Sequence, residues 1–466
     1  MLRASAVSEQ AGLPTSTLVC EGFLELAAAA SVGQGMPNLP VAMVPGHTGV
    51  QSKEVLRRNI LEVTLEEIIN NLVGAPEAAI GVTDPPARHA VLTGTYDEVN
   101  DYFADHKLSD GLPIVPPTRD RIDAFLKHTD SAPETVLGIL LPDMRQATIW
   151  SVAVNGVMAG CKPEYMPILV ALVEAMCDPY YGVEHSGNTP GAETQIILNG
   201  PLIKELNFNY SQGAMRDGFR PNSTIGRFWR LYLRNIPGFL PHGNDKATYG
   251  NTWRVVVAEN EDVVEEIGWE PLSVEMGFRK GANTVTIARY TGGNHISSVS
   301  GSRPEEMVPY LAEAMVQQNT CRLAFTVGDR SGTLRPLLLL SPILARSIAK
   351  AGWSKADLCK AIHEKARMPA WQMERFLRDW MVKPQWNLAN EVRFNRLPKV
   401  YFESEDPNRL VPIVWDAEDY MVVVTGDPAR NSVYILAHNG VLGYPTAKEI
   451  RLPADWARLR SGSSTH

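Results

Sequence analysis

The sequence predicts an α/β and α+β protein: a partial parallel βα unit at the N-terminus, followed by a large mixed α+β domain. Two apolar stretches predict the first unit, because each precedes a helical stretch: "TSTLVC" (residues 15–20) and "LPVAMVP" (residues 39–45). Neither alternates polar and apolar residues, as is typical of parallel strands covered on both faces. Beyond residue 96, strand-like stretches lie among helices of several kinds, which predicts the mixed domain.

The N-terminal unit is expected to span residues 1–75. The stretch "AGLPTSTLVCEGF" reads as a helix end, a tight turn, a strand and a strand-to-helix switch, and "SKEVLRRNILEVTLEEIINNLV" reads as one or two amphipathic helices. Two strands alone form at best a marginal sheet. We therefore expect the unit to take strands either from elsewhere in the chain or from another polypeptide. Residues 76–95 are rich in Pro and Gly and are predicted to be a linker.

The large domain is expected to span residues 96–466. "TIWSVAVNGVMAGC" and "PEYMPILVALVEAMC" predict two apolar helices, the first ending at Gly and the second restarting with Pro. The strand candidates are "TQIILNGP", "TWRVVVAEN", "ANTVTIARY", "CRLAFTVG", "YMVVVTG" and "SVYILAH".

Composition excludes several classes of protein. The chain has 466 residues and a formal charge of −8, with no Lys/Arg run, so nucleic acid is not an expected partner. The apolar stretches are too short or too interrupted to span a bilayer, and no signal peptide is apparent, so no membrane association is expected. Five cysteines without a CxxC pair indicate reduced thiols in a cytoplasmic protein.

The stretch "VNGVMAGCKPEYMP" (residues 154–167) contains the first candidate for catalysis. If Cys161 lies at the start of the second apolar helix, the helix dipole favours its thiolate, and Cys161 is then the expected nucleophile or redox thiol. Asn155 is a polar residue in an apolar helix and is a candidate for substrate binding. The alternative is a small buried thiol at a tight helix crossing.

The stretch "RPNSTIGRFWRLYLRN" (residues 220–235) predicts an anion site. Asn222, Ser223 and Thr224 are typical helix N-cap residues, and free amides at a helix start bind carboxylate or phosphate. Arg227 is expected to add charge-assisted hydrogen bonds. The alternative is an ordinary capped helix. A nucleotide is not expected, because no P-loop or GxGxxG pattern is present.

Three loops rich in Gly and polar residues complete the candidate site. They carry the expected proton-transferring residues His185, His242 and His295, and the substrate-binding candidates Thr189 and Asn244. The alternative is plain turn chemistry, with Gly, Asn and Asp shaping the turns. No HExxH motif or Cys/His cluster occurs, so no metal is predicted, and the sequence indicates no particular cofactor.

Residues 9–27, "EQAGLPTSTLVCEGFLELA", and residues 35–49, "GMPNLPVAMVPGHTG", resemble the C-terminal half of the UGSC-type domain. This bacterial α/β family is named for its Sec/Cys-Gly-Ser-Cys motif, which in the family lies upstream of the matching stretch and which this sequence lacks. The resemblance implies a second subunit that carries the front half with its thiol or selenol. The alternative is a reduced relic that packs on the large domain. The rest of the chain resembles an uncharacterised bacterial family associated with such domains, which implies no particular reaction.

Together these observations predict an enzyme, or the large subunit of one, that acts on a small anionic organic molecule. The expected reaction is thiol-linked redox chemistry, or cleavage or formation of a carbon–heteroatom bond, so that the enzyme is an oxidoreductase or a lyase. The alternative is a non-catalytic partner subunit that completes and positions a UGSC-type redox protein.

Overall fold

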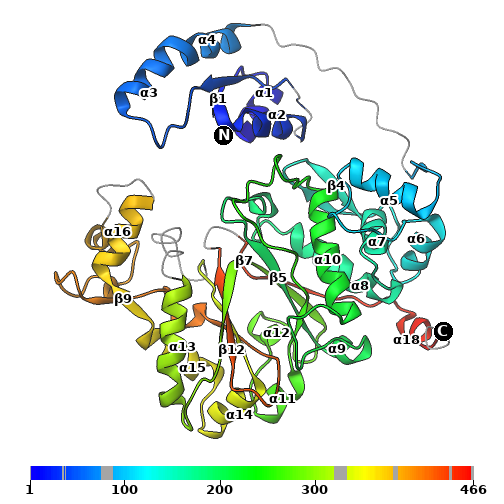
Figure 1. Ribbon diagram of the computed structural model, residues 1–466, viewed down its shortest axis with the longest axis vertical. Coiled ribbons are helices and arrows are strands. Elements are labelled where there is room, and N and C mark those ends of the chain that lie inside the picture. Colours follow the sequence, from blue (N-terminus) through cyan, green and yellow to red (C-terminus); the bar gives the residue numbers. More distant parts are fainter. Residues whose placement is uncertain are drawn as a thin grey trace. The chain divides into compact units, whose positions relative to one another are not determined.

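The computed structural model describes residues 2–33, 36, 38–74, 88–319, 333–380, 387–439 and 443–462 (Figure 1). It divides into two compact units. Unit 1 comprises Met1–Pro116, Gly138–Ala147 and Tyr232–Lys246, and unit 2 comprises Pro117–Leu137, Thr148–Leu231 and Ala247–His466. The predicted mixed α/β class is confirmed. The predicted boundaries at residues 75 and 96 stay a prediction, because most of the expected linker lies outside the described residues.

The N-terminal segment contains the two βα units that the sequence predicts. Its elements are α1 (Leu2–Gln10), β1 (Thr17–Cys20), α2 (Leu24–Gly33), β2 (Val41–Val44), α3 (Lys53–Asn59), a π-helical turn (Ile60–Thr64) and α4 (Leu65–Val73). Strands β1 and β2 pair in parallel, with Thr17 opposite Val41. Within the described residues this sheet has two strands, and no strand from elsewhere in the chain joins it. Unit 1 also holds α5 (Tyr96–Asp105), which begins at a Thr95/Glu98 capping box.

Most other helices belong to unit 2, and the predicted apolar pair is confirmed as α7 (Ile149–Met158) and α8 (Met166–Met176). A Cβ on Gly156 of α7 would lie 2.7 Å from Leu169 of α8, so glycine permits this close crossing. Helix α10 (Arg220–Asn235) continues into unit 1. The remaining helices are α6 (Arg119–Leu126), α9 (Leu202–Glu205), α11 (Glu261–Glu266), α12 (Leu272–Glu275), α13 (Pro304–Asn319), α14 (Pro342–Lys350), α15 (Lys355–Lys365), α16 (Ala370–Trp380), α17 (Leu388–Arg393) and α18 (Trp456–Gly462).

A curled mixed sheet forms the centre of unit 2. Its strands are β5 (Glu193–Asn199), β6 (Val257–Ala258), β7 (Thr284–Ile296), β8 (Leu337–Leu340), β11 (Met421–Val424), β12 (Val433–His438) and β13 (Thr446–Glu449). The order is β11-β8-β12-β7-β5-β6, and β13 pairs with β7 beside this path. The ends of the outermost strands meet, since Asn260 N donates to Val424 O at 2.7 Å and Thr425 Oγ1 donates to Ala258 O at 3.0 Å. Two small sheets pair β3 (Val136–Leu140) with β4 (Arg145–Thr148), and β9 (Arg367–Pro369) with β10 (Leu410–Pro412).

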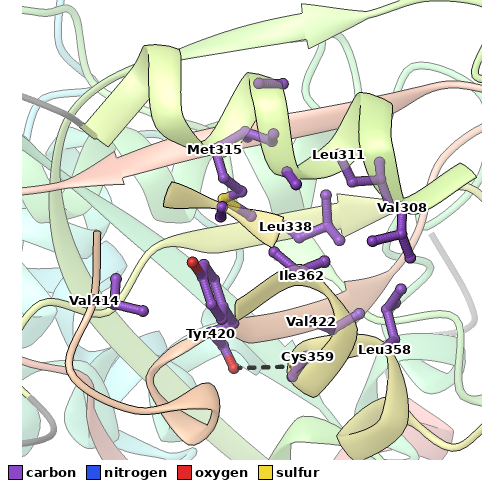
Figure 2. Close-up of a cluster of buried hydrophobic side chains, with 14 of the residues drawn as sticks. Val308, Leu311, Met315, Leu338, Leu358, Cys359, Ile362, Val414, Tyr420 and Val422 are labelled. Atoms are coloured by element: carbon purple, nitrogen blue, oxygen red, sulfur yellow. Dashed lines mark hydrogen bonds between the residues drawn. The ribbon is translucent and has the colours of Figure 1, made fainter. Parts of the chain in front are cut away.

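Apolar residues cover both faces of the curled sheet. One cluster takes residues from all six strands of the path and so lies on the face that the curl encloses; it includes Ile197, Val257, Tyr290, Leu337, Val423 and Leu436. The other face packs against helices α13 and α15, where Figure 2 shows Met315 and Ile362 beside Leu338 of β8. The Cys359 thiol donates to Tyr420 O in this second cluster, at 3.8 Å.

Three elements differ from the expectations. The stretch "TWRVVVAEN" contributes only the two-residue strand β6. Residues 290–296, expected in a loop, continue β7, because the distal part of this strand pairs with β12. Strand β8, with the sequence "LLLL", was not predicted as a strand. The candidate strand "CRLAFTVG" lies outside the described residues.

Candidate functional site

A cavity of about 400 Å³ among the described residues of unit 2 is a candidate binding site. Its volume falls in the range of pockets that hold small organic molecules. Strand β5 supplies one lining residue, and the segment before β6 supplies most of the others. The lining residues are Gln195, Met215, Asp217, Asn251, Thr252, Trp253, Arg254 and Val255.

Strand β5 places Gln195 at the cavity. Alternate residues of a strand share a face, so Gln195 lies on the same face as Ile197, which belongs to the enclosed cluster. The Gln195 side chain is fully buried. Its amide Nε2 donates to Val255 O at 2.9 Å and to Ile196 O at 3.1 Å. Its Oε1 is buried and has no hydrogen-bond partner among the described residues.

The segment of residues 251–256 is held against unit 2 at several points. Asn251 Nδ2 donates to Gly191 O at 2.7 Å. The amide of Asn222 on α10 donates to Val256 O at 2.8 Å, and Val256 N returns a bond to Asn222 O. A Cβ at Gly226 would overlap Arg254 O, so glycine lets the helix touch this backbone. These contacts fix the backbone that carries Arg254.

Arg254 is the cation of the cavity lining. Its Nε and Nη2 atoms are buried, and the part of the chain that the structure describes provides no hydrogen-bond partner for them. Burial lowers the pKa of the guanidinium, and the negative charge of Glu193 opposes that shift. Glu193 is itself only 3% exposed and has a second cation nearby, since Arg230 Nη1 lies 3.8 Å from its Oε2. The arrangement offers paired donors on Arg254 and an acceptor on Gln195.

The structure brings Cys161, Thr224 and Arg227 together, as the sequence analysis expected of a site. However, Cys161 is 6% exposed, and burial raises the pKa of its thiol to about 12, against the opposing effects of Thr224 and of the charges on Arg220 and Arg227. This shift runs against the expectation of a reactive thiolate, which applied only if Cys161 caps the second helix. A 3-10 turn (Pro163–Tyr165) leads directly into α8 and has Lys162 as its N-cap, so Cys161 lies just before the capping residue and does not cap the helix.

The polar residues near Cys161 are used by the fold. Asn155 is buried, and its Nδ2 donates to Ser151 O at 2.9 Å. Helix α10 already begins at Arg220, so the expectation that Asn222, Ser223 and Thr224 precede it as N-caps is wrong. Thr224 Oγ1 donates to Arg220 O at 2.7 Å within the first turn, and Ser223 Oγ accepts from Gly218 N at 3.1 Å.

The other predicted site residues do not line the cavity. His185, Thr189 and His295 are exposed residues of unit 2, and His295 lies on β7 opposite Tyr434 rather than in a loop. Within unit 1, His242 is exposed in a turn with a φ of 66°. Asn244, also of unit 1, is 8% exposed and closes that turn.

The bonds of Asn244 explain its burial. Its Nδ2 donates to Asp143 Oδ1 at 3.2 Å and to Gly238 O at 3.3 Å. Burial raises the pKa of Asp143, while Arg145 and the Asn244 amide oppose the shift. Asn244 is therefore part of a structural turn, which is the alternative that the sequence analysis left open for this loop.

A buried ion network that was not predicted from the sequence lies at the ends of β5 and β6. Lys355 Nζ lies 3.2 Å from Glu259 Oε1 and 3.1 Å from Glu275 Oε1. Glu259 is fully buried and also accepts from Asn199 Nδ2 at 2.7 Å. Glu259 and Glu261 line a second cavity of about 380 Å³, whose charged residues are mostly acidic. Burial raises the pKa of Glu261.

Gln195 and Arg254 were also missed as site residues, although both lie in or beside stretches that the sequence analysis considered. The available signal was a polar residue inside an apolar stretch: Gln195 in "TQIILN" and Arg254 in "TWRVVV". Among the described residues, no group of three His, Cys, Asp or Glu side chains is placed to hold a metal ion. None of the described helices combines the length and apolarity that crossing a membrane requires.

The fold is of the mixed α/β class, and its larger unit contains a cavity of about 400 Å³. In the comparison with known families, the UGSC family model matches residues 1–74. The predicted resemblance of this segment to the UGSC family is thus confirmed. No curated protein matches the chain, and no solved structure does.

Proposed function

We propose that the chain is a cytoplasmic enzyme, or the large subunit of one, whose unit 2 binds a small anionic organic molecule at Arg254. The observation that carries the proposal is the pair of unpartnered, buried guanidinium nitrogens on a residue that lines a cavity of about 400 Å³. Buried polar groups without partners are costly, and an arginine is satisfied best by a carboxylate or phosphate. A bound anion supplies the missing hydrogen bonds and adds to the negative charge that Glu193 already provides.

The proposed reaction class remains thiol-linked redox chemistry, or cleavage or formation of a carbon–heteroatom bond. Cys161 is a poor source of the reactive thiolate, because burial raises its pKa to about 12. A thiol with this pKa is almost entirely protonated at neutral pH and is a weak nucleophile. In this proposal the chain holds the substrate, and the reactive thiol or selenol comes from a UGSC-type partner.

The test is a binding screen on the full chain by thermal shift, followed by calorimetry. The screen contains small carboxylates, phosphates and sulfonates at pH 7. We expect at least one anion to raise the melting temperature, and Arg254→Gln to abolish that shift. Arg430→Gln is the matched control, because Arg430 is exposed and lies 4.0 Å from Asp427. Binding that is unchanged in Arg254→Gln, or no shift with any anion, contradicts the proposal.

A specific observation also favours the second candidate, a partner subunit that completes a UGSC-type domain. The outer edge of β2 is covered by helical side chains, because Asn71 Nδ2 donates to Val41 O at 2.9 Å and Thr64 Oγ1 donates to Met43 O at 2.8 Å. On β1 the described residues provide no comparable cover, and Leu18 is 42% exposed. An open strand edge is a template for addition of another strand.

The partner candidate is tested by co-expression with a protein that contains Cys-Gly-Ser-Cys or its Sec form. We expect the two proteins to co-purify at low salt, and Leu18→Lys to disrupt the complex, because a charge on an edge strand opposes pairing. Val50→Lys is the control, since Val50 is 83% exposed and lies outside the strands. A chain that turns over substrate alone, as a folded monomer or homodimer, rejects the partner-only function.

A further inference from the structure

The unpartnered atoms of the cavity lining point to a particular class of ligand, if the proposed function holds. The amide of Gln195 has a fixed orientation, because its Nε2 donates to two backbone carbonyls, Ile196 O and Val255 O. Turning the amide over would place its oxygen against both carbonyl oxygens. Oε1 is therefore an acceptor in need of a donor, and it has none within the described structure.

The two unpartnered atoms of Arg254 lie on one edge of the guanidinium. Nε and Nη2 present parallel N–H bonds, which match the two oxygens of a carboxylate. The same chain shows this geometry elsewhere: Arg346 uses Nε and Nη2 to bind both oxygens of Glu266, at 2.8 Å and 2.7 Å. The free edge of Arg254 is thus suited to one planar, bidentate anion.

Both residues line the same cavity and are held by the same backbone. Val255, whose carbonyl accepts from Gln195, directly follows Arg254 in the chain. A ligand that reaches these unpartnered atoms from the cavity meets a pair of donors and a separate acceptor. The acceptor discriminates between ligands, because a ligand without a donor leaves Gln195 Oε1 buried and unpaired.

We infer that the cavity takes a small carboxylate that also carries a hydroxyl or amino donor, with the carboxylate on Arg254 and the donor on Gln195. This inference names the substrate class of the proposed anion site and rests on that proposal. Asp217 also lines the cavity and supplies a negative charge, which favours an amino group over a hydroxyl group where both are offered.

The experiment is calorimetry on the full chain with matched ligands: propionate, lactate and alanine, then succinate, malate and aspartate. Within each trio the carbon skeleton is the same and only the donor differs. We expect the ligands with a donor to bind about tenfold or more tightly than the one without, as a buried unpaired acceptor implies. Arg254→Lys is expected to weaken every carboxylate by about tenfold, because lysine keeps the charge but loses the bidentate edge.

The variant Gln195→Met tests the acceptor. The substitution also removes the hydrogen bond to Val255 O and can therefore lower stability. The readout is the ratio of the affinities for malate and succinate in each variant. A general loss of stability weakens both ligands and does not change this ratio. We expect this ratio to fall towards one. If the unmodified chain binds the three ligands of each trio with equal affinity, the inference is overturned. If Arg254→Lys nevertheless weakens the binding of these ligands, the proposed anion site itself is still supported. Failure of all six ligands and of inorganic phosphate overturns the anion site itself.

Discussion

Replacing Lys355 by methionine tests the buried ion network most directly. Lys355 is 7% exposed and lies between Glu259 and Glu275, at 3.2 Å and 3.1 Å. Glu259 is fully buried, so loss of the ammonium leaves a carboxylate whose hydrogen bonds come from neutral groups only. Removal of one partner from a buried pair costs about 3–5 kcal/mol. Since domains have only about 5–15 kcal/mol in total, Lys355→Met should lose a large share of the unfolding free energy.

The assay is urea unfolding at pH 7, monitored by tryptophan fluorescence. The dependence of the unfolding free energy on urea concentration should have the same slope in all variants, so that their stabilities can be compared. Arg346→Met is the matched control, because the Arg346–Glu266 pair is solvent-exposed and such pairs contribute about 0–1 kcal/mol. The double variant Lys355→Met with Glu259→Gln should recover part of the loss, since it removes the uncompensated charge. A loss in Lys355→Met no larger than in Arg346→Met refutes the reasoning.

The pH dependence of this network has a definite sign. Burial alone would lower the pKa of Lys355, but Glu259 and Glu275 outweigh burial and the pKa is raised. When folding raises the pKa of a lysine, its charge stabilises the folded state to the full extent at any pH below about 10.5, the pKa of lysine in the unfolded chain. This stabilisation disappears as the pH rises through the pKa of the lysine in the folded state. The difference in stability between the unmodified chain and Lys355→Met should therefore be constant near neutrality and shrink in strong alkali.

Three other changes have defined outcomes. Maleimide at pH 8, mapped by mass spectrometry, should label the partly exposed Cys20 but not Cys161 until denaturant is added, and rapid native labelling of Cys161 contradicts its burial. Burial raises the pKa of Glu261, which means that the charged carboxylate destabilises the fold. Glu261→Gln should therefore increase the melting temperature at pH 7.5, and this gain should disappear near pH 4. A decrease in the melting temperature at pH 7.5 contradicts this prediction. Gly226→Ala places a Cβ against Arg254 O, so it should lower the unfolding free energy by about 1–3 kcal/mol and weaken anion binding. An unchanged melting temperature and an unchanged affinity would show that α10 can shift to make room for the methyl group.

The elements that could be predicted from sequence are those with local signals. The two strands of the first βα units are apolar runs ended by turn residues, and α7 and α8 are separated by Gly160 and Pro163. Strand β8 was missed because a short apolar run does not distinguish a strand from a buried helix. The length of β7 was missed because its distal part, rich in Gly and polar residues, is ordered by pairing with β12, which comes much later in the chain.

The candidate site depended on contacts that a single sequence does not reveal. Asn222 looks like a helix cap, but its amide binds the backbone of Val256, some thirty residues further on. Cys161 has flanking Gly and Pro residues that suggest a helix start, but its pKa is decided by burial. Gln195 and Arg254 meet at one cavity because β5 and β6 are parallel neighbours, and the chain between these strands is long.

The joined ends of β6 and β11 set a condition on how unit 2 forms. Residues near 258–260 bind partners at 424–425, so the ring of strands closes only when most of the chain has left the ribosome. Until then, one apolar face of β5, β6 and β7 stays exposed to solvent. Pairings between segments that are so distant in the sequence also form slowly. We therefore expect newly made chains to need shielding during synthesis, and we expect variants that lack β11 to accumulate as insoluble material.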